Sequence, residues 1–289
     1  MYTYPGSFIG IIFNSTNITS YEQRTYIARI YVILNHYLEA MAKQLYDYWF
    51  VQFDFPDENG IPYKSSGGKM IWNEKLKKEI PLGWECCLLS DYLSVYSEKV
   101  TPGEVRKDDR YAPIEVLPRN KMCFSECAPI ENALSGLCRF KYKHILLSNR
   151  RVYFHKVCIA PFDGLTRDTV IVLNPIHKYL LGYSYQLVND DKFIEYATRH
   201  SYGTEQPVLS WEAAKQYKVI KPSNNWDKRY SFILETIIDD VVANEHEISE
   251  LTKQRDVLLP LLMTGQASVT QLNNDLPSTF IIMRKTSQI

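Results

Sequence analysis

The residues best suited to bind a partner form a basic and aromatic run from Arg139 to Lys156 (RFKYKHILLSNRRVYFHK). No acidic residue interrupts this run, and tyrosine and phenylalanine alternate with the cations. Basic side chains neutralise phosphates, and arginine also reads base edges in the major groove of DNA. The run therefore predicts a DNA contact. The alternative is a solvated edge strand whose charges protect it from pairing with other chains.

The end of this run supplies the first candidate contact residues: Arg150, Arg151, Tyr153, His155 and Lys156. A strand over RVYFHK would place Arg151, Tyr153 and His155 on one face, and the alternation predicts that this face is exposed. Two loops supply the remaining candidates, because recognition residues concentrate on loops held by a rigid scaffold. They are Arg167 in the turn from Phe162 to Asp168, and Arg199, His200, Tyr202 and Thr204 in RHSYGTEQP. Simple solvation of surface loops is the alternative.

Motifs for catalysis are missing from the sequence. It contains no GxGxxG, Walker A, HExxH or GxSxG pattern. The six cysteines form neither a disulfide framework nor a zinc-binding spacing, which predicts reduced and mostly buried thiols. We therefore expect no catalytic residue, no cofactor and no metal site. A catalytic DNA methyltransferase or nuclease is the less favoured alternative.

Composition adds little about partners, because the formal net charge of the 289 residues is zero. The segment from Glu74 to Lys221 holds 22 basic and 18 acidic residues, a weak excess of positive charge. The first residues lack the basic region and cleavage site of a signal peptide, and no apolar run approaches the ~20 residues of a membrane span. We expect a cytoplasmic protein without a membrane partner.

A long amphipathic helix is predicted over residues 20–49, after a lead-in segment 1–19 with one strand around Phe8 to Phe13. Ser20 and Gln23 have the spacing of a capping box. Apolar residues then recur at heptad-like spacing, and a helix of this length spans roughly 40 Å. The stripe comprises Ile27, Ile30, Leu34, Tyr37, Met41, Leu45 and Tyr48.

A second long helix is predicted over residues 225–264, followed by a poorly ordered tail at 265–289. Polar Asn244 and Arg255 interrupt its apolar stripe, as register-fixing residues do in coiled coils. Pro260 is expected to kink or end the helix, and Gly265 is a plausible stop. The stripe comprises Leu234, Ile237, Val241, Asn244, Ile248, Leu251, Arg255, Leu258 and Leu262.

These elements predict an α+β fold: one mixed α/β recognition domain at 50–224, flanked by two long helices that pair as an antiparallel coiled coil. Both helices exceed the ~11-residue average, which favours a projecting pair. The alternative is that each helix lies on the body as part of its core. The expected pairing or partner interface comprises Ile30, Leu34, Met41, Ile237, Val241, Asn244, Ile248, Leu251, Arg255 and Leu258.

Four segments carry a resemblance to a known family, the specificity (S) subunits of type I restriction–modification systems. The junction LEAMAKQLYDYWFVQFDFPDENGIPYKSSGGKMIWNEKLKKEIPLGWE resembles the passage from their conserved helix into a target-recognition domain. RDVLLPLLMTGQ resembles the end of their distal conserved helix. Two segments of the body resemble parts of their target-recognition domains, and these matches are looser: NRRVYFHKVCIAPFDG and HSYGTEQPVLSWEAAKQYKVIKP.

The resemblance implies a subunit that recognises double-stranded DNA and is not itself the catalyst. In that family two target-recognition domains each read one half-site, and two helices act as a ruler and dock methyltransferase (M) subunits, and through them restriction (R) subunits. A ruler of ~40 Å is comparable to the ~34 Å turn that separates paired half-sites.

This chain departs from the family pattern, since the first target-recognition domain is missing and residues 1–19 are at most its remnant. One body then reads one half-site, and a homodimer or another S chain supplies the second. Two alternatives stay open: a truncated or silent cassette that is inactive alone, and a helical assembly protein that does not read DNA.

Overall fold

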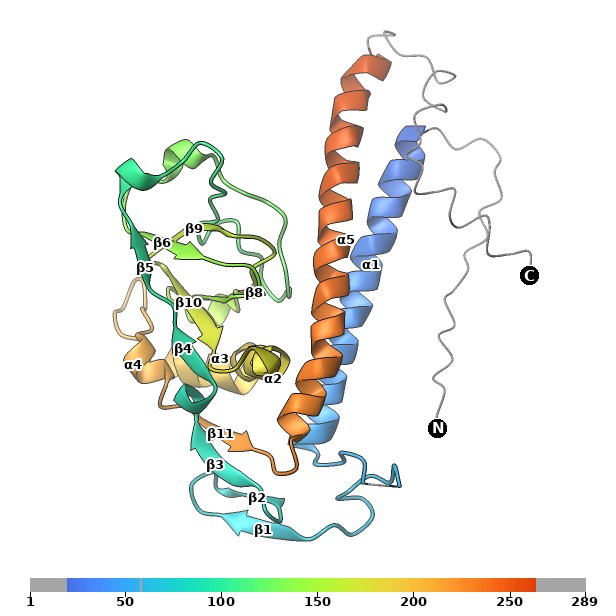
Figure 1. Cartoon of the computed structure of the whole chain (residues 1–289), viewed down its shortest axis with the longest axis vertical. Coiled ribbons are helices and arrows are strands. Elements are labelled where there is room, and N and C mark those ends of the chain that lie inside the picture. The colour runs from blue at the N-terminus through green and yellow to red at the C-terminus, as the bar shows by residue number, and fades with distance from the viewer. Residues whose placement is uncertain (1–19, 58, 264–289) are drawn as a thin grey trace, which may run out of the picture. The chain divides into compact units, whose positions relative to one another are not determined.

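The computed structural model describes residues 20–57 and 59–263, which form two compact units. Residues 31–249 make the larger unit, and residues 20–30 with 250–263 make the smaller one. The predicted strand around Phe8 to Phe13, the stop at Gly265 and the disordered tail lie outside the described residues. Helices and small sheets together give the predicted α+β class (Figure 1).

The strands pair in four small antiparallel sheets, ordered β1-β2, β4-β10-β7-β8, β11-β3 and β5-β6-β9. Their bounds are β1 Met70–Asn73, β2 Lys78–Pro81, β3 Glu85–Leu88, β4 Leu93–Val95, β5 Glu98–Val100, β6 Leu137–Phe140, β7 Ile145–Ser148, β8 Val157–Ile159, β9 Gly164–Arg167, β10 Val170–Pro175 and β11 Lys218–Lys221. The apolar run from Val170 to Leu173 lies in β10.

The four-stranded sheet separates two hydrophobic cores. Strand β7 is buried along its whole length, and its side chains alternate between the two faces. Ile145 and Leu147 join the larger core, while Leu146 packs with Phe140 and Val172 in the smaller one. An uninterrupted apolar run is what a strand covered on both faces requires.

Two long helices and three short ones complete the described chain: α1 Ser20–Tyr46, α2 Leu181–Asn189, α3 Asp191–Arg199, α4 Trp211–Ala214 and α5 Trp226–Met263. Helix α1 begins at Ser20, where the capping pattern predicts it, and the Asp190 side chain caps α3 by accepting from the Lys192 N–H. Pro260 does not end α5, which continues to Met263.

The joint between α1 and the body is an aromatic cluster. One π-helical turn, Asp47–Val51, follows α1 and turns the chain into the body. Trp49, Phe50, Phe53 and Phe55 are buried, whereas Tyr48 is exposed. The ring centroids of Trp49 and Trp226 lie 5.1 Å apart, so the same cluster anchors the start of α5.

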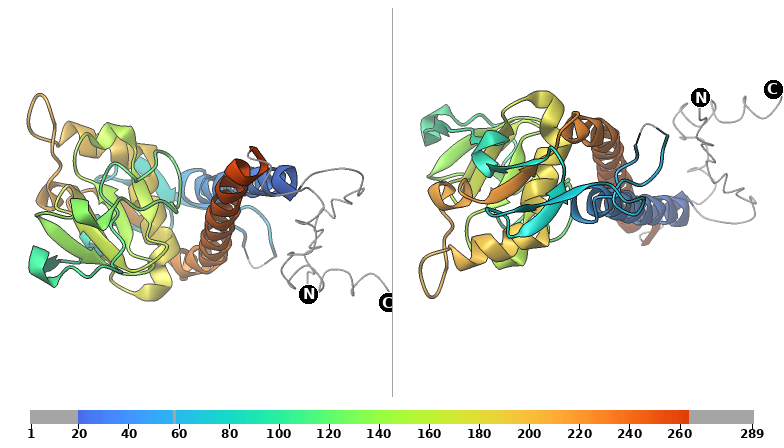
Figure 2. Two further views of the ribbon diagram at one scale, coloured as in Figure 1. Left: turned by 90° about the horizontal axis from the view of Figure 1, so that it is seen from above. Right: turned by 90° about the horizontal axis from the view of Figure 1, so that it is seen from below.

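Helix α5 is bound to the body along residues 226–249 (Figures 1 and 2). The backbone N–H of Tyr183 in the buried helix α2 donates to the Ser231 hydroxyl at 2.9 Å. Farther along α5, Asp239 forms a 2.6 Å ion pair with Lys143. Figure 2 shows the strands of the body on one side of this part of α5. This segment thus packs as a core helix.

Helices α1 and α5 contact each other in opposite directions within the larger unit. The Asn244 amide donates to the Asn35 side-chain oxygen at 2.7 Å, and the Tyr230 hydroxyl donates to the Ala42 carbonyl at 3.0 Å. Both asparagines are buried, and Asn35 also donates to Glu245 at 3.2 Å. The buried pair of Asn35 and Asn244 therefore marks the alignment of α1 against α5.

Replacing Asn244 by leucine is expected to lower the free energy of unfolding by about 1–3 kcal/mol, because the buried Asn35 oxygen loses its donor. The double variant Asn35→Leu/Asn244→Leu should lose less than the two single variants combined. Urea unfolding of the four proteins measures this coupling. Additive losses would show that the two amides do not stabilise each other.

A carboxylate in the joint predicts a local pH dependence. The Ser65 hydroxyl and backbone N–H donate to Asp54 at 2.6 and 2.7 Å, and these bonds lower the pKa of Asp54 below its ordinary value. The stabilisation is thus present above the unfolded-state pKa of ~3.9 and is lost as pH falls through the lower folded-state pKa.

The variant Ser65→Ala should therefore be less stable than the wild type at pH 5–6 and approach it as the pH falls through the lowered pKa of Asp54. Chemical unfolding across that pH range provides the test, with Ser66→Ala as the matched control. Ser66 is exposed and only its backbone N–H forms a bond, to the Pro62 carbonyl. A constant difference between wild type and Ser65→Ala at all pH values would contradict this account.

Candidate nucleic-acid interface

Three segments that are distant in the sequence meet at one edge of the body. The Asn149 N–H donates to the Thr169 carbonyl at 3.0 Å, and its side-chain amide donates to the Asp168 carbonyl at 2.7 Å. The Arg151 N–H donates to the Pro207 carbonyl at 2.9 Å. We call residues 149–151, 167–169 and 202–208 the three-loop edge. Its segments carry Arg150, Arg151, Arg167, Tyr202 and Thr204.

The third segment is itself a closed loop. Tyr202 and Val208 exchange backbone hydrogen bonds of 3.0 and 2.8 Å, and Gly203 has φ +98°, a conformation that suits glycine. The loop is fastened to Arg150 by a bridge with Val208. Tyr202 and Thr204 therefore stand exposed on a loop that the neighbouring segments hold in place.

The predicted strand over RVYFHK is wrong. Val152–Phe154 is a single 3₁₀ turn, flanked by left-handed residues Arg151 (φ 47°) and His155 (φ 50°). Left-handed backbone is uncommon for residues other than glycine and is found where the surroundings enforce it. Because the chain turns here, Arg151, Tyr153 and His155 do not lie on one face of a strand.

The arginines of the edge differ in how they are bound. The Arg150 guanidinium donates to the Gln206 amide oxygen at 3.4 Å, whereas the Arg151 side chain has no acceptor among the described residues. Arg167 is exposed, and its charge and its side-chain hydrogen bond to Tyr111 both oppose the rise that burial causes in the pKa of that phenol. Arg151 is therefore the cation of the edge with the most freedom to bind an outside anion.

Two predicted contact residues are used inside the fold. The His155 Nε2 donates to the Asn189 carbonyl at 3.0 Å, and its Nδ1 lies 3.5 Å from Asp191. The Lys156 amino group donates to the Ile114 carbonyl at 2.6 Å, and burial lowers the pKa of this lysine. These two side chains fix α3 and the Ile114 loop to the 3₁₀ turn.

The remaining candidates lie beside the edge. Arg199 is exposed at the end of α3, 3.3 Å from Glu195, and the His200 ring stacks on Tyr196 with centroids 3.9 Å apart. Tyr153 is half exposed on the 3₁₀ turn and packs edge-on against Phe154. An exposed ion pair such as Arg199–Glu195 is weak, so Arg199 can still exchange partners.

The first half of the basic run is mostly structural. Tyr142 and Lys143 bind Asp239 of α5, and Arg139 pairs with Glu98 at 3.1 Å and with Asp109 at 3.6 Å. His144 is buried, and burial lowers its pKa. The run is therefore divided: residues 139–144 stabilise the body, and residues 149–151 form the edge.

Three residues of this region were not among the predicted DNA contacts, although Gln206 lies in the predicted recognition loop RHSYGTEQP. Asn149 joins the first two loops, Gln206 binds Arg150, and the Arg119 guanidinium lies 3.9 Å from the centroid of the Phe154 ring. An asparagine directly after the apolar strand ILLS is a turn signal that could have identified Asn149. Nothing local in the sequence indicates the pairing of Arg119 with Phe154.

The predicted interface residues separate by exposure in the larger unit. On α5, Ile237, Val241 and Asn244 are buried, and Ile248 is half-buried. On α1, Leu34 and Met41 are 42% and 51% exposed, so this stripe faces away from the core. In the smaller unit Leu258 is buried, and the half-buried residues are Ile30, Leu251 and Arg255, the last paired with Asp256 at 2.6 Å.

We call the exposed apolar side chains of α1 the α1 stripe: Val32, Ile33, Leu34, Tyr37 and Met41. Exposed apolar patches of this kind mark surfaces that bind other proteins. Asn35 and Ala42, on the opposite face of the same helix, contact α5. Helix α1 therefore has an occupied face and a free apolar face.

Over residues 20–57 and 59–263, no group of three His, Cys, Asp or Glu side chains is placed to hold a metal ion. Cys123 and Cys158 are buried, and burial raises the pKa of both thiols. In the same part of the chain, no helix combines the length and apolar character needed to cross a bilayer.

Comparison with known proteins identifies a relative. No protein-family model matches the chain. The chain is 26% identical over 253 residues to the type I restriction enzyme MjaIX specificity subunit of Methanocaldococcus jannaschii. The match covers 82% of this chain and 55% of that protein, so the chain spans about half the length of the curated relative. The predicted resemblance to type I specificity subunits is confirmed.

Solved structures of type I systems also match 83% of the chain. One comes from a study of complex assembly and conformational transition of the type I R-M system; the identity is 12%, the match covers 55% of that chain, and the TM-score is 0.40. Another is the HsdS subunit of Thermoanaerobacter tengcongensis, with 11% identity, 54% of that chain covered and a TM-score of 0.37. A third is the S subunit of M. genitalium, with 15% identity, 55% of that chain covered and a TM-score of 0.46.

Proposed function

We propose, on the premise of this similarity, that the chain is a non-catalytic, sequence-specific DNA-recognition subunit of a type I restriction–modification complex. The body, residues 50–224, reads one half-site of double-stranded DNA through the three-loop edge. The helices dock methyltransferase subunits, and through them restriction subunits, and pair as a coiled coil. The single observation that carries the proposal is the match to a specificity subunit over 82% of the chain.

The geometry of the edge supports DNA reading in three ways. Arg151 and Arg167 present guanidinium groups that can bind phosphate or the O6 and N7 atoms of guanine. Backbone hydrogen bonds hold all three loops, so the side chains are positioned before DNA binds. Tyr202 and Thr204 add exposed groups that can donate or accept hydrogen bonds.

The α1 stripe supports docking of a protein partner. Its apolar side chains lie on a helix whose opposite face is already fixed to α5 and to the body, where the Met122 N–H donates to Glu39 at 3.0 Å. A rigid, apolar helix face is the form in which helix-mediated interfaces present their anchors. We assign it to the methyltransferase subunit.

The proposed function is tested by selecting DNA from a random library with the chain and its co-encoded methyltransferase subunit. Enrichment of one sequence, weakened by salt, is expected. Addition of the methyltransferase subunit should strengthen the selection. If no sequence is enriched with both proteins present, the chain is not an active DNA-recognition subunit.

Changing Tyr37 and Met41 together to glutamate is expected to leave the fold intact and to weaken methyltransferase binding at least tenfold, because both side chains are exposed on the α1 stripe. Analytical ultracentrifugation of the mixed subunits measures the loss. Gln44→Glu is the control, since Gln44 is an exposed polar residue of the same helix. Equal binding by the double variant and the control would remove the stripe from the docking surface.

A further inference from the structure

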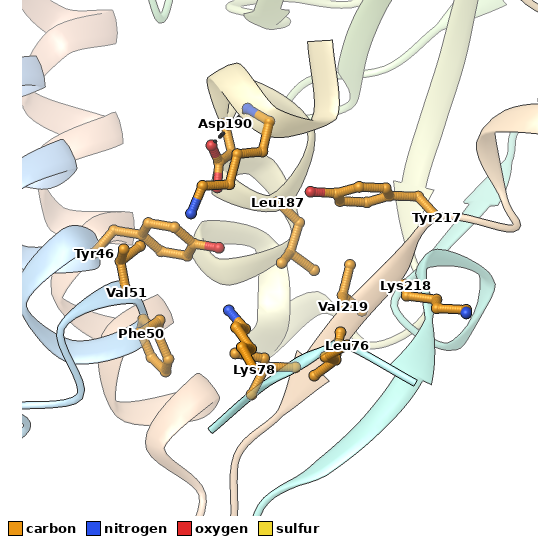
Figure 3. A pocket seen from close by; sticks show the side chains of 12 residues that line it. Tyr46, Phe50, Val51, Leu76, Lys78, Leu187, Asp190, Tyr217, Lys218 and Val219 are labelled. Atoms are coloured by element: carbon orange, nitrogen blue, oxygen red, sulfur yellow. Dashed lines mark hydrogen bonds between the residues drawn. The ribbon is translucent and has the colours of Figure 1, made fainter. Parts of the chain in front are cut away.

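A small cavity of about 50 Å³ lies beside the joint between α1 and the body. Its walls come from the end of α1, the π-helical turn, strands β2 and β11, and the connection between α2 and α3 (Figure 3). One water molecule needs roughly 10–15 Å³ measured in this way, so the cavity holds several water molecules or one small ion.

Rigid elements hold the two phenol groups of the cavity. The Tyr46 ring packs against Phe50 and Tyr230, with centroids 5.3 and 5.8 Å away. The Tyr217 ring packs against Phe193 at 5.3 Å and Tyr196 at 5.0 Å. Neither ring can turn away without breaking these aromatic contacts, so their hydroxyl positions are fixed.

Three polar groups converge on the cavity. Figure 3 shows the Lys78 amino group and the hydroxyls of Tyr46 and Tyr217 pointing inward. Among the described residues none of these three groups has a hydrogen-bond or ion-pair partner, and the Lys78 amino group lies 5.4 Å from the centroid of the Phe53 ring. The hydroxyls keep some access to solvent, so a ligand that accepts hydrogen bonds from them takes the place of water.

The charges around the cavity favour an anion. Lys78 and Lys192 line it and have no carboxylate partner in the described part of the chain, while the amino group of Lys218 donates to the Lys75 carbonyl at 3.3 Å. The acid of the lining is Asp190, whose carboxylate already accepts the Lys192 N–H at 2.9 Å as the cap of α3.

The pKa of Lys78 fits a cationic pocket. Burial lowers this pKa, the charge of Lys192 lowers it further, and Asp190 opposes the change. An anion between the two lysines would offset the repulsion between them. The Lys78 ammonium can only donate and both phenol hydroxyls can donate, so together they complement a ligand that accepts hydrogen bonds.

We propose that this joint cavity binds a small oxyanion of the phosphate, sulfate or carboxylate class, held by the Lys78 amino group and the hydroxyls of Tyr46 and Tyr217. Lys192 contributes long-range attraction. The ion lies where α1 enters the body, so its binding stiffens the connection between the helix and the recognition domain. The site is separate from the three-loop edge and does not depend on DNA reading.

The test uses the full chain without DNA. Sodium phosphate, sodium sulfate and sodium acetate are titrated at constant ionic strength against sodium chloride, and the melting temperature and binding heat are recorded. We expect the melting temperature to rise to a plateau with at least one of the three anions. The anion that reaches its plateau at the lowest concentration identifies the class of ligand. Lys78→Met should weaken binding at least tenfold, and Tyr217→Phe several-fold.

Matched variants separate binding from folding. Tyr46→Phe keeps the aromatic packing and removes only the hydroxyl, so it should fold and bind several-fold more weakly. Lys192→Met changes an exposed side chain and should also weaken binding, whereas the exposed Lys221→Met, outside the cavity, should bind as the wild type does. The proposal is overturned if none of the three anions gives a saturable effect, or if Tyr46→Phe, Tyr217→Phe and Lys192→Met all bind like the wild type.

Discussion

Replacing Arg151 by alanine is expected to weaken specific DNA binding by about 1–3 kcal/mol, which is roughly a 5- to 150-fold loss, if its free guanidinium contacts a guanine. Arg167→Ala and Arg150→Ala should each have a smaller effect, because Tyr111 and Gln206 already share hydrogen bonds with these side chains. Electrophoretic or fluorescence titration with the selected DNA, at a stated salt concentration, measures each loss.

The controls for this prediction distinguish base reading from general charge. Lys69→Ala removes one exposed positive charge in the joint, away from the edge, and should change binding little. Arg199→Ala should weaken binding on all sequences alike if that arginine contacts phosphate. Should Arg151→Ala and Lys69→Ala bind the selected DNA equally well, the three-loop edge is not the reading surface.

Replacing Gly182 by valine is expected to destabilise the body by more than the ~1–3 kcal/mol that is typical of overpacking. A Cβ atom at this position would lie 2.7 Å from the Leu234 Cβ and 2.9 Å from the Ser231 Cα. The clash involves backbone, so α2 and α5 would have to separate. With a shift of roughly 2–4 °C per kcal/mol, thermal unfolding resolves this loss easily.

Gly182→Ala should also lower the stability of the body, but by less than Gly182→Val does, although alanine is a better helix former than glycine by ~1 kcal/mol. Gly103→Ala is the matched control, because nothing lies within 4 Å of its added Cβ. It should change stability by less than ~0.5 kcal/mol. A stable Gly182→Val variant would show that α2 and α5 can separate at this contact without loss of stability.

The sequence predicted the long-range plan well because periodic patterns are local and repeated. The spacing of apolar residues located α1 and α5, and the resemblance of the segment that begins at Leu38 identified the junction between helix and body. In each case the pattern reflects burial on one face or both, and burial decides the structure of these segments.

The three-loop edge could be predicted only in part. Arg150, Arg151, Arg167, Tyr202 and Thr204 were chosen by type, and the fold brings them together through backbone bonds that no sequence pattern encodes. The turn at Val152 failed as a prediction because left-handed backbone at Arg151 and His155 is imposed by tertiary contacts. His155 and Lys156 look like surface cations in the sequence but satisfy buried carbonyl groups.

The α1 stripe shows why apolar spacing alone cannot identify a partner. Leu34 and Met41 follow the same heptad-like pattern as Ile237 and Val241, yet only the α5 residues are buried. The α1 face that meets α5 carries Asn35 and Ala42, a polar residue and a small one that lie outside the predicted stripe. A stripe predicts that a face will be covered, and the covering element has to be found in space.

The most direct test of the central claim is to express the chain with its co-encoded methyltransferase subunit, determine the mass of the complex, and map the methylated bases in the host DNA. The account predicts a stable complex and one defined methylated sequence. Two copies of the chain in the complex predict a target made of two identical half-sites in inverted orientation. Arg151→Ala should abolish or relax the same target without dissolving the complex. A stable complex that methylates no defined sequence, or a methylation pattern unchanged by replacing both Arg151 and Arg167, would contradict the claim that this body reads DNA through the three-loop edge.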